Sequence, residues 1–351
     1  MPCTTMPFEQ YSNRGLTGLS NLGNTCFMNA ALQCLSHSYA FNEFLAKGIF
    51  KTKLNKRPDS LVLLEWDKLR KMMWSENCII SPGGFFSSIQ KVAKVKDKLL
   101  FTGFAQNDLP EFLGFLIGCF HAAIQREVNM EIKGNVVTET DKLAKNCFAM
   151  MKTMYKKEYS EILGLFYGIH VSKIETLPAP GDYINSTPEP FLMLDLALPS
   201  GGNPTLLSCI ESYTAAETLD EDNKVVNPAT GEKVVGSKRI LFWSLPELLI
   251  ITLKRFSNSM RKNKCLVDFP LENLDLSPYV VGYDSDSYVY DLFGICNHGG
   301  GVLGGHYTSF VRNANGRWYH YNDTHVSPVQ KESQLKSPLA YCFFYRKKKD
   351  T

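Results

Sequence analysis

The sequence lacks several features that would assign it to a simple class of protein. It has no apolar run of about 18 residues and no hydrophobic signal core near its start, so it favours neither a membrane partner nor secretion. Its net charge of +3 is too small to favour nucleic acid as a partner. It contains no internal repeat or low-complexity segment. These absences predict an intracellular protein, cytoplasmic or nuclear.

Paired cysteines are also missing. The chain has 10 cysteines, and no two of them are separated by two residues. Because that spacing is typical of zinc ligands, we expect no structural metal and no cofactor. Scattered cysteines without a signal peptide are typical of a reducing compartment. A hydrophobic content of 44% with 21% charged residues is that of a globular protein.

One cysteine lies in an unusual setting. Cys26 follows turn and cap residues at 23–25 and precedes an apolar face that recurs with helical spacing over 27–35. The pattern predicts that Cys26 lies at a helix N-terminus, where backbone N–H groups and the helix dipole favour a thiolate nucleophile. Cys34 lies on the apolar face of the same helix, so burial is the better interpretation for it.

Asn21 lies five residues before this cysteine. Its amide could donate a hydrogen bond to the oxyanion that forms when a thiolate attacks a carbonyl. It could equally serve only to shape the turn. The spacing leaves both interpretations open.

A histidine near the end of the chain is the candidate base. His306 begins the first strand of a predicted hairpin whose turn is Asn313–Gly316. A four-residue loop sets His306 opposite Asp323, and a five-residue loop sets it opposite Asn322. The sequence does not decide between these two partners. A thiol, an imidazole and an amide or carboxylate, in this order, are the components of a cysteine hydrolase.

The segment before His306 is rich in glycine, with five glycines between residues 299 and 305. Glycine permits close approach of the backbone to a ligand, or a loop that moves. The alternative is a long mobile loop without a role.

Four segments together resemble the motifs of a known family. They are similar to the Cys box, the Gln-Gln-Asp helix start, the Leu-Lys-Arg-Phe strand and the His box of the ubiquitin-specific proteases, which are papain-like deubiquitinases. The segments stand in the order of that family, between about Arg14 and Arg346: residues 18–35, 104–113, 248–256 and 290–326.

The resemblance implies a role for each candidate catalytic residue. Cys26 corresponds to the nucleophile, His306 to the general base and Asn322 to the residue that orients the imidazole. Asp323 would then support the site, and Asn21 would be the oxyanion donor.

The resemblance also implies a narrow channel that holds the extended tail of ubiquitin. The residues that correspond to its lining are Gln106, Asp108, Gly304, Gly305 and Tyr307. Asp108 is a candidate partner for an arginine of that tail. The sequence alone equally favours a capping box made by Asp108 and Glu111 at the start of a helix.

The implied fold is α+β, a papain-like cysteine protease fold with a helical half followed by a β-rich half and an active site between them. The family's zinc-binding segments would fall at 169–178 and 223–233, and neither contains cysteine, so we expect a finger-like sheet without zinc. The expected parts are an N-terminal arm (1–13), a thumb (about 14–165), fingers (about 166–245), a palm (about 246–347) and a basic tail (348–351).

The resemblance therefore implies a deubiquitinating thiol hydrolase. It would cleave the peptide or isopeptide bond after the C-terminal glycine of ubiquitin through a Cys26 thioester. Its expected partners are ubiquitin and ubiquitinated proteins, and we expect a monomer. Two alternatives stay open: the same chemistry on a ubiquitin-like modifier such as NEDD8 or SUMO, and a non-catalytic ubiquitin receptor.

Overall fold

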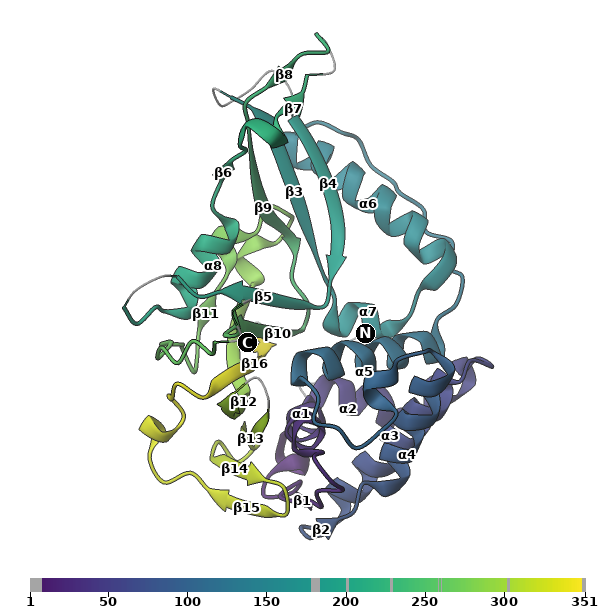
Figure 1. Cartoon of the computed structure of the whole chain (residues 1–351). Helices are drawn as coiled ribbons and strands as arrows, with labels where there is room; N and C mark the ends of the chain where they lie inside the picture. Colours follow the sequence, from purple (N-terminus) through teal and green to yellow (C-terminus); the bar gives the residue numbers. More distant parts are fainter. Residues whose placement is uncertain are drawn as a thin grey trace.

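The helices gather in the first half of the chain, as the periodicity predicts (Figure 1). The computed structural model describes residues 8–177, 184–199, 202–227, 230–257, 259, 261–301 and 304–348. The helices are α1 (Cys26–Ser36), α2 (Tyr39–Ala46), α3 (Asp59–Ser75), α4 (Gly83–Val95), α5 (Leu109–Ile124), α6 (Glu139–Glu158), α7 (Glu161–Phe166) and α8 (Leu206–Thr214).

An eight-stranded sheet forms most of the second half of the chain. Its order is β15-β14-β13-β12-β16-β10-β5, with β11 paired to β12. Only β5 and β10 run parallel among these pairs. The strands are β5 (Met193–Ala197), β10 (Leu248–Lys254), β11 (Leu274–Asp275), β12 (Val289–Gly301), β13 (Gly304–Arg312), β14 (Trp318–Asn322), β15 (His325–Pro328) and β16 (Ala340–Lys347).

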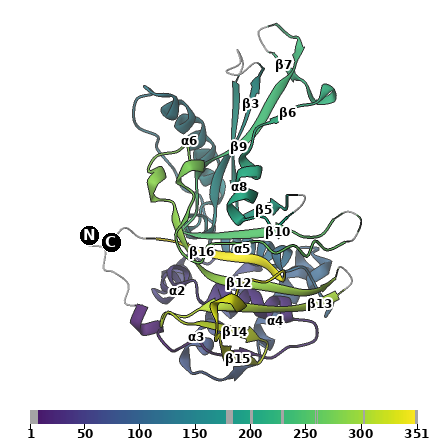
Figure 2. The ribbon, with the colours of Figure 1, turned by 90° about the vertical axis from the view of Figure 1, so that its left-hand side faces the viewer.

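A second sheet, here called the finger sheet, projects away from this body (Figure 2). It has the order β4-β3-β9-β6, and α6 packs beside β4. The short pairs β7·β8 and β1·β2 are separate from both sheets. The bounds are β3 (Gly168–Thr176), β4 (Ile184–Phe191), β6 (Glu217–Thr218), β9 (Gly236–Ser244), β7 (Val225–Val226), β8 (Lys233–Val234), β1 (Gly18–Leu19) and β2 (Ile79–Ile80).

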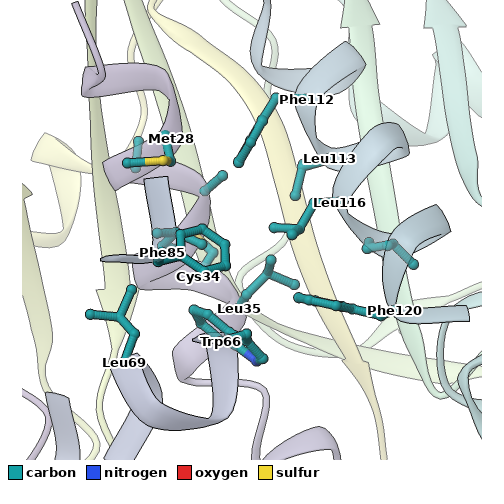
Figure 3. Close-up of a cluster of buried hydrophobic side chains, with 14 of the residues drawn as sticks. Met28, Cys34, Leu35, Trp66, Leu69, Phe85, Phe112, Leu113, Leu116 and Phe120 are labelled. Carbon is teal, nitrogen blue, oxygen red and sulfur yellow. The ribbon is translucent and has the colours of Figure 1, made fainter. Parts of the chain in front are cut away.

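Helix α1 lies in the main core, between the other helices and the eight-stranded sheet. Every residue from Cys26 to Ser36 is buried, which is the pattern of a helix packed on all sides. Met28 and Leu35 contribute to a cluster that also contains Trp66 and Phe112 from neighbouring helices (Figure 3). The helix also contacts β12, β13 and β14. The core therefore fixes the helix that begins with Cys26 against the strand that carries His306.

Most of the predicted elements are confirmed, and Cys34 is buried as expected. The turn residues at 227–231 predict a hairpin over 224–235, and β7 and β8 form it, although residues 228–229 of its turn lie outside the described residues. The proline-rich composition of 176–187 predicts a loop, which is wrong at its end, because β4 begins at residue 184 and pairs with β3; residues 178–183 lie outside the described residues. Residues 1–7 of the predicted arm and 349–351 of the tail also lie outside the described residues.

The glycine-rich segment is not a long loop. Gly299–Gly301 of β12 pair with Gly304–His306 of β13, so the ladder continues almost to the tip. Close contact requires glycine at two of these positions: a Cβ on Gly305 would lie 2.2 Å from the carbonyl oxygen of Gly299, and one on Gly300 would lie 2.5 Å from the Cα of Gly305. Among the described residues, no helix is long and apolar enough to cross a membrane.

Candidate active site

Cys26 is the first residue of α1, as predicted. The N-cap residue Thr25 makes no side-chain capping bond, because its hydroxyl accepts a hydrogen bond from the N–H of Leu22 (2.9 Å). Only 3% of Cys26 is exposed, and its Sγ accepts a hydrogen bond from Nε2 of Gln106 (3.7 Å). The nucleophile candidate is thus held beside the residue predicted to line the channel.

The environment of this thiol disfavours its ionisation. Burial is the largest effect on the pKa of Cys26 and raises it, and the carboxylate of Asp323 raises it further. Hydrogen bonds from the N–H groups of Tyr307 and Phe27 and from the Gln106 amide lower the pKa by less. The N–H of Phe27 at the helix start lowers the pKa of Cys26, as expected, but desolvation outweighs it and the net shift is upward.

His306 and Asn322 meet directly. Nε2 of His306 lies 2.6 Å from Oδ1 of Asn322, so the amide oxygen can accept the Nε2–H and leave Nδ1 as the proton acceptor. In the part of the chain that is described, no hydrogen bond joins His306 to Sγ of Cys26. The imidazole is therefore oriented by Asn322 and is not hydrogen-bonded to the thiol.

The hairpin reaches this result through a register that differs from both predicted ones. Arg312 pairs with Trp318, so the loop has five residues, 313–317, but it begins one residue later than the five-residue loop that would set His306 opposite Asn322. Neither predicted pairing for His306 is therefore correct. Asn313, the first residue of this loop, is bound to the N-terminal segment: its side chain accepts from the N–H of Asn13 (3.0 Å) and donates to the carbonyl of Arg14 (2.8 Å). The orienting partner on β14 is Asn322, which the resemblance implied.

Among the described residues, no hydrogen bond joins the Asp323 carboxylate to the imidazole of His306. Asp323 has a left-handed backbone (φ 49°) and its carboxylate accepts from the side-chain amides of Asn21 (3.0 Å) and Asn29 (2.8 Å). Its carbonyl accepts the N–H of Leu19 (2.9 Å). Asp323 therefore connects the end of the hairpin to the loop before Cys26.

The structure answers the open question on Asn21 in part. Its Oδ1 accepts from the N–H groups of Gly23 (3.0 Å) and Thr25 (3.1 Å), so the residue does shape the turn. Its Nδ2 has a second hydrogen beside the one donated to Asp323. Turn formation and oxyanion donation are therefore compatible, and the second role stays a prediction.

A groove leads to this site, and the predicted channel residues lie in it or border it. Gly305 donates its N–H to Oε1 of Gln106 (2.9 Å), and Nε2 of Gln106 donates back to the carbonyl of Gly305. The groove has a volume of about 320 Å³ and is lined by Gln106, Asn107, Asp108, Phe256, His298, Gly301, Gly304 and Tyr307. A larger groove of about 890 Å³, lined by residues of α5, β5 and β10, shares Asp108 and Phe256 with it.

Asp108 does not take part in the predicted capping box. It is the N-cap residue of α5 but makes no side-chain capping bond, so the predicted capping box with Glu111 is wrong. Its carboxylate instead accepts from the hydroxyls of Tyr307 (3.0 Å) and Tyr341 (2.9 Å). Burial raises the pKa of Asp108, and the two hydroxyls oppose this shift. Contact with a tail arginine stays a prediction.

Sequence reasoning missed Asn29 and Tyr341. The signal for Asn29 was available: it is an amide on a helix whose other faces are apolar, one turn after Cys26. Tyr341 gave no local signal, because its contact with Asp108 joins residues 233 positions apart.

The site defines a class of protein. A thiol at a helix start and an imidazole oriented by an amide, beside a groove whose lining residue Gln106 contacts the thiol, are the arrangement used by cysteine hydrolases. Comparison with known proteins gives the family. The profile described as "Ubiquitin carboxyl-terminal hydrolase" matches residues 17–345, and the chain belongs to this family.

Individual proteins with the same family description are similar to this chain. The chain is 33% identical to human ubiquitin carboxyl-terminal hydrolase 2 over 346 residues, covering 95% of this chain and 55% of that protein. It is 32% identical to human ubiquitin carboxyl-terminal hydrolase 21 over 357 residues, covering 95% of this chain and 61% of that protein. The chain therefore spans little more than half the length of these relatives.

Solved structures show the same fold. The Ubp8/Sgf11/Sus1/Sgf73 module of SAGA bound to ubiquitin aldehyde contains a chain that matches with a TM-score of 0.74 and 25% identity, covering 97% of this chain and 71% of that one. The same module with a substituted Ubp8, bound to monoubiquitin, matches with a TM-score of 0.73 and 25% identity, over 100% and 72% of the two chains.

Proposed function

We propose that this protein is a thiol hydrolase that cleaves the peptide or isopeptide bond after the C-terminal glycine of ubiquitin. One observation carries the proposal: a groove bordered by Gly301 and Gly304 is also lined by Gln106, whose amide contacts the Cys26 thiol. Such a groove accepts an extended chain that ends in small residues and excludes larger side chains. Ubiquitin ends in Gly-Gly.

The proposed reaction begins with proton transfer from Cys26 to Nδ1 of His306. The thiolate attacks the carbonyl carbon of the terminal glycine, and the free Nδ2 hydrogen of Asn21 stabilises the oxyanion. The carbon–nitrogen bond then breaks, and His306 gives its proton to the departing lysine amine. A water molecule, deprotonated by His306, hydrolyses the thioester and restores the Cys26 thiol.

We propose that two contacts change when the substrate tail binds. Nε2 of Gln106 holds Sγ of Cys26, and the same amide pairs with the backbone of Gly305 across the path of the tail. A substrate tail that pairs with Gly305 would replace the Gln106 amide and release the thiol toward His306. We therefore propose that binding of the tail assembles the nucleophile and base.

The remaining assignments are part of the same proposal. Gln106, Asp108, Gly304, Gly305 and Tyr307 would contact the tail, and the finger sheet would contact the folded part of ubiquitin. The division into a thumb (14–165), fingers (166–245) and a palm (246–347) is supported by the change from helices to strands and by the separate finger sheet. Ubiquitin as the partner is supported by the related module bound to ubiquitin aldehyde.

The test is reaction of the protein with ubiquitin that carries a C-terminal electrophile, beside an equal NEDD8 probe. We expect the ubiquitin probe to label the wild-type protein rapidly and to leave the Cys26→Ala variant unlabelled. A matched control is Cys34→Ala, eight residues along the same helix and buried, which should keep labelling. Faster labelling by the NEDD8 probe would identify NEDD8 as the preferred substrate. Binding of ubiquitin without labelling would favour a non-catalytic ubiquitin receptor.

A further inference from the structure

Asn29 occupies an unusual position for an amide. It lies on α1, three residues after Cys26, and only 3% of it is exposed. Its Nδ2 lies 2.8 Å from Oδ1 of Asp323 and 3.3 Å from each of the carbonyls of Leu19 and Ser20. Burying an amide is costly unless it is hydrogen-bonded, so this side chain is held in place by its acceptors.

The acceptor in this contact is itself connected to the oxyanion candidate. The second carboxylate oxygen of Asp323 accepts from Nδ2 of Asn21 at 3.0 Å. Asn29 and Asn21 therefore hold the two oxygens of one carboxylate, and the rotation of that carboxylate sets where the Asn21 amide points. The direction of the free Nδ2 hydrogen of Asn21 therefore depends on the hydrogen bond that Asn29 donates to the same carboxylate.

Removal of Asn29 would leave this carboxylate with one side-chain donor in place of two. A carboxylate with a free oxygen can rotate or bind water, and the Asn21 amide can follow it. Oxyanion donors act only when they are fixed where charge develops, because their advantage is that no reorganisation is needed during the reaction. Loss of Asn29 should therefore weaken the chemical step more than substrate binding.

We propose that Asn29 is a positioning residue that acts through Asp323 to orient Nδ2 of Asn21 toward the oxyanion. The proposal rests on the proposed thiol hydrolase function and adds to it a residue that touches neither the substrate nor the reacting atoms.

The chain offers a matched control in Gln33. It lies one turn further along α1, is 1% exposed, and donates from Nε2 to the carbonyl of Thr17 (2.8 Å). Among the described residues, the side-chain oxygens of both Asn29 and Gln33 lack a hydrogen-bond partner. Gln33→Ala therefore reproduces the loss of a buried amide from the same helix without touching Asp323.

The experiment is a double-mutant cycle on hydrolysis of a ubiquitin C-terminal amide substrate, using Asn29→Ala, Asp323→Ala, the double variant and Gln33→Ala. For Asn29→Ala we expect a fall in kcat on the order of 10- to 100-fold with KM within about twofold, below the cost of removing an oxyanion donor itself. The double variant should be no slower than Asp323→Ala, because both changes break one connection. Gln33→Ala should keep kcat within about threefold.

Two further measurements separate positioning from general damage. Alkylation of Cys26 by chloroacetamide should proceed at the wild-type rate in Asn29→Ala, because the thiol itself is not altered. Asn29→Ser, which keeps a short donor, should recover part of the lost kcat. Loss of cooperative unfolding in both Asn29 variants would assign a structural role and overturn the proposal.

The remaining outcomes distinguish the two proposals. Equal kcat values for Asn29→Ala and Gln33→Ala, or effects of Asn29→Ala and Asp323→Ala that multiply, would overturn the positioning role alone. A wild-type protein that folds but hydrolyses no ubiquitin substrate would overturn the proposed function and this inference with it.

Discussion

The body and the finger sheet are packed very differently. In the body, one continuous core joins the helices α1–α5 to the eight-stranded sheet, and a second core covers the other face of that sheet. The finger sheet has a small cluster with α6, whose buried members are Ala144, Cys147, Ile169, Val171 and Trp243. The candidate catalytic residues all lie on the body.

This difference in packing predicts different roles for the body and the finger sheet. Cys26, His306 and Asn322 need positions fixed to fractions of an ångström, and densely packed elements supply them. A thinly supported sheet can adapt to the surface of a folded partner. We therefore expect changes in the body to affect kcat and global stability, and changes in the finger sheet to affect mainly substrate binding.

The largest effect should come from the base. His306→Ala should lower kcat on the order of 10²- to 10⁴-fold, because proton transfer to and from the thiol and the leaving amine is lost. The matched control is His320→Gln on β14, which leaves the His306–Asn322 contact in place. Steady-state kinetics with a ubiquitin amide substrate measures kcat for both variants. Equal losses in the two variants would contradict the assignment of the base.

Removal of an aromatic side chain should destabilise the protein more in the body than in the finger sheet, by a few kcal/mol. Trp66 is fully buried at the centre of the body, and Trp66→Ala should cost about 3–5 kcal/mol of unfolding free energy. Phe148 is half-buried on α6, with its ring 5.8 Å from that of Trp243. Phe148→Ala should cost only about 1–2 kcal/mol. Urea unfolding measures both, and equal costs would show that the finger sheet is as tightly packed as the body.

Acid should destabilise the body through a buried histidine. Burial lowers the pKa of His37 to about 4, with its Nδ1 against the carbonyl of Gln33 (2.9 Å). The unfolded chain takes up this proton near pH 6.5 and the folded chain only near pH 4, so stability present above pH 6.5 is lost as the pH falls between these values. The loss should reach about 3 kcal/mol.

His37→Gln should remove this part of the pH dependence, whatever its effect on stability at pH 8. The measurement is urea unfolding of both proteins from pH 8 to pH 4. An equal slope of unfolding free energy against pH in both would show that His37 is not the source.

The smallest effect should be that of metal removal. Because the finger segments contain none of the paired cysteines that hold zinc, treatment with a chelator should change neither kcat nor the unfolding midpoint. Loss of activity that Zn²⁺ restores would show a metal site that the cysteine spacing does not reveal. It would also show that the finger sheet is held more firmly than its packing indicates.

The predictions from sequence succeeded where local pattern was sufficient. Helical spacing predicted that Cys26 begins α1, and strand alternation predicted that His306 and its partner lie at one end of a hairpin. The register of that hairpin was not predicted. At its turn lies Asn313, whose side chain is bound to Arg14, 299 positions away in the sequence, a contact that no local pattern contains.

The sequence by itself determined which residues are chemically able to act and on which face each lies, because those properties repeat with the period of a helix or strand. Only the tertiary structure decided their partners and their ionisation. Asn21 and Asp323 are 302 positions apart, and the burial that raises the pKa of Cys26 comes from the whole core. Desolvation and long-range hydrogen bonds depend on packing, which no local pattern contains.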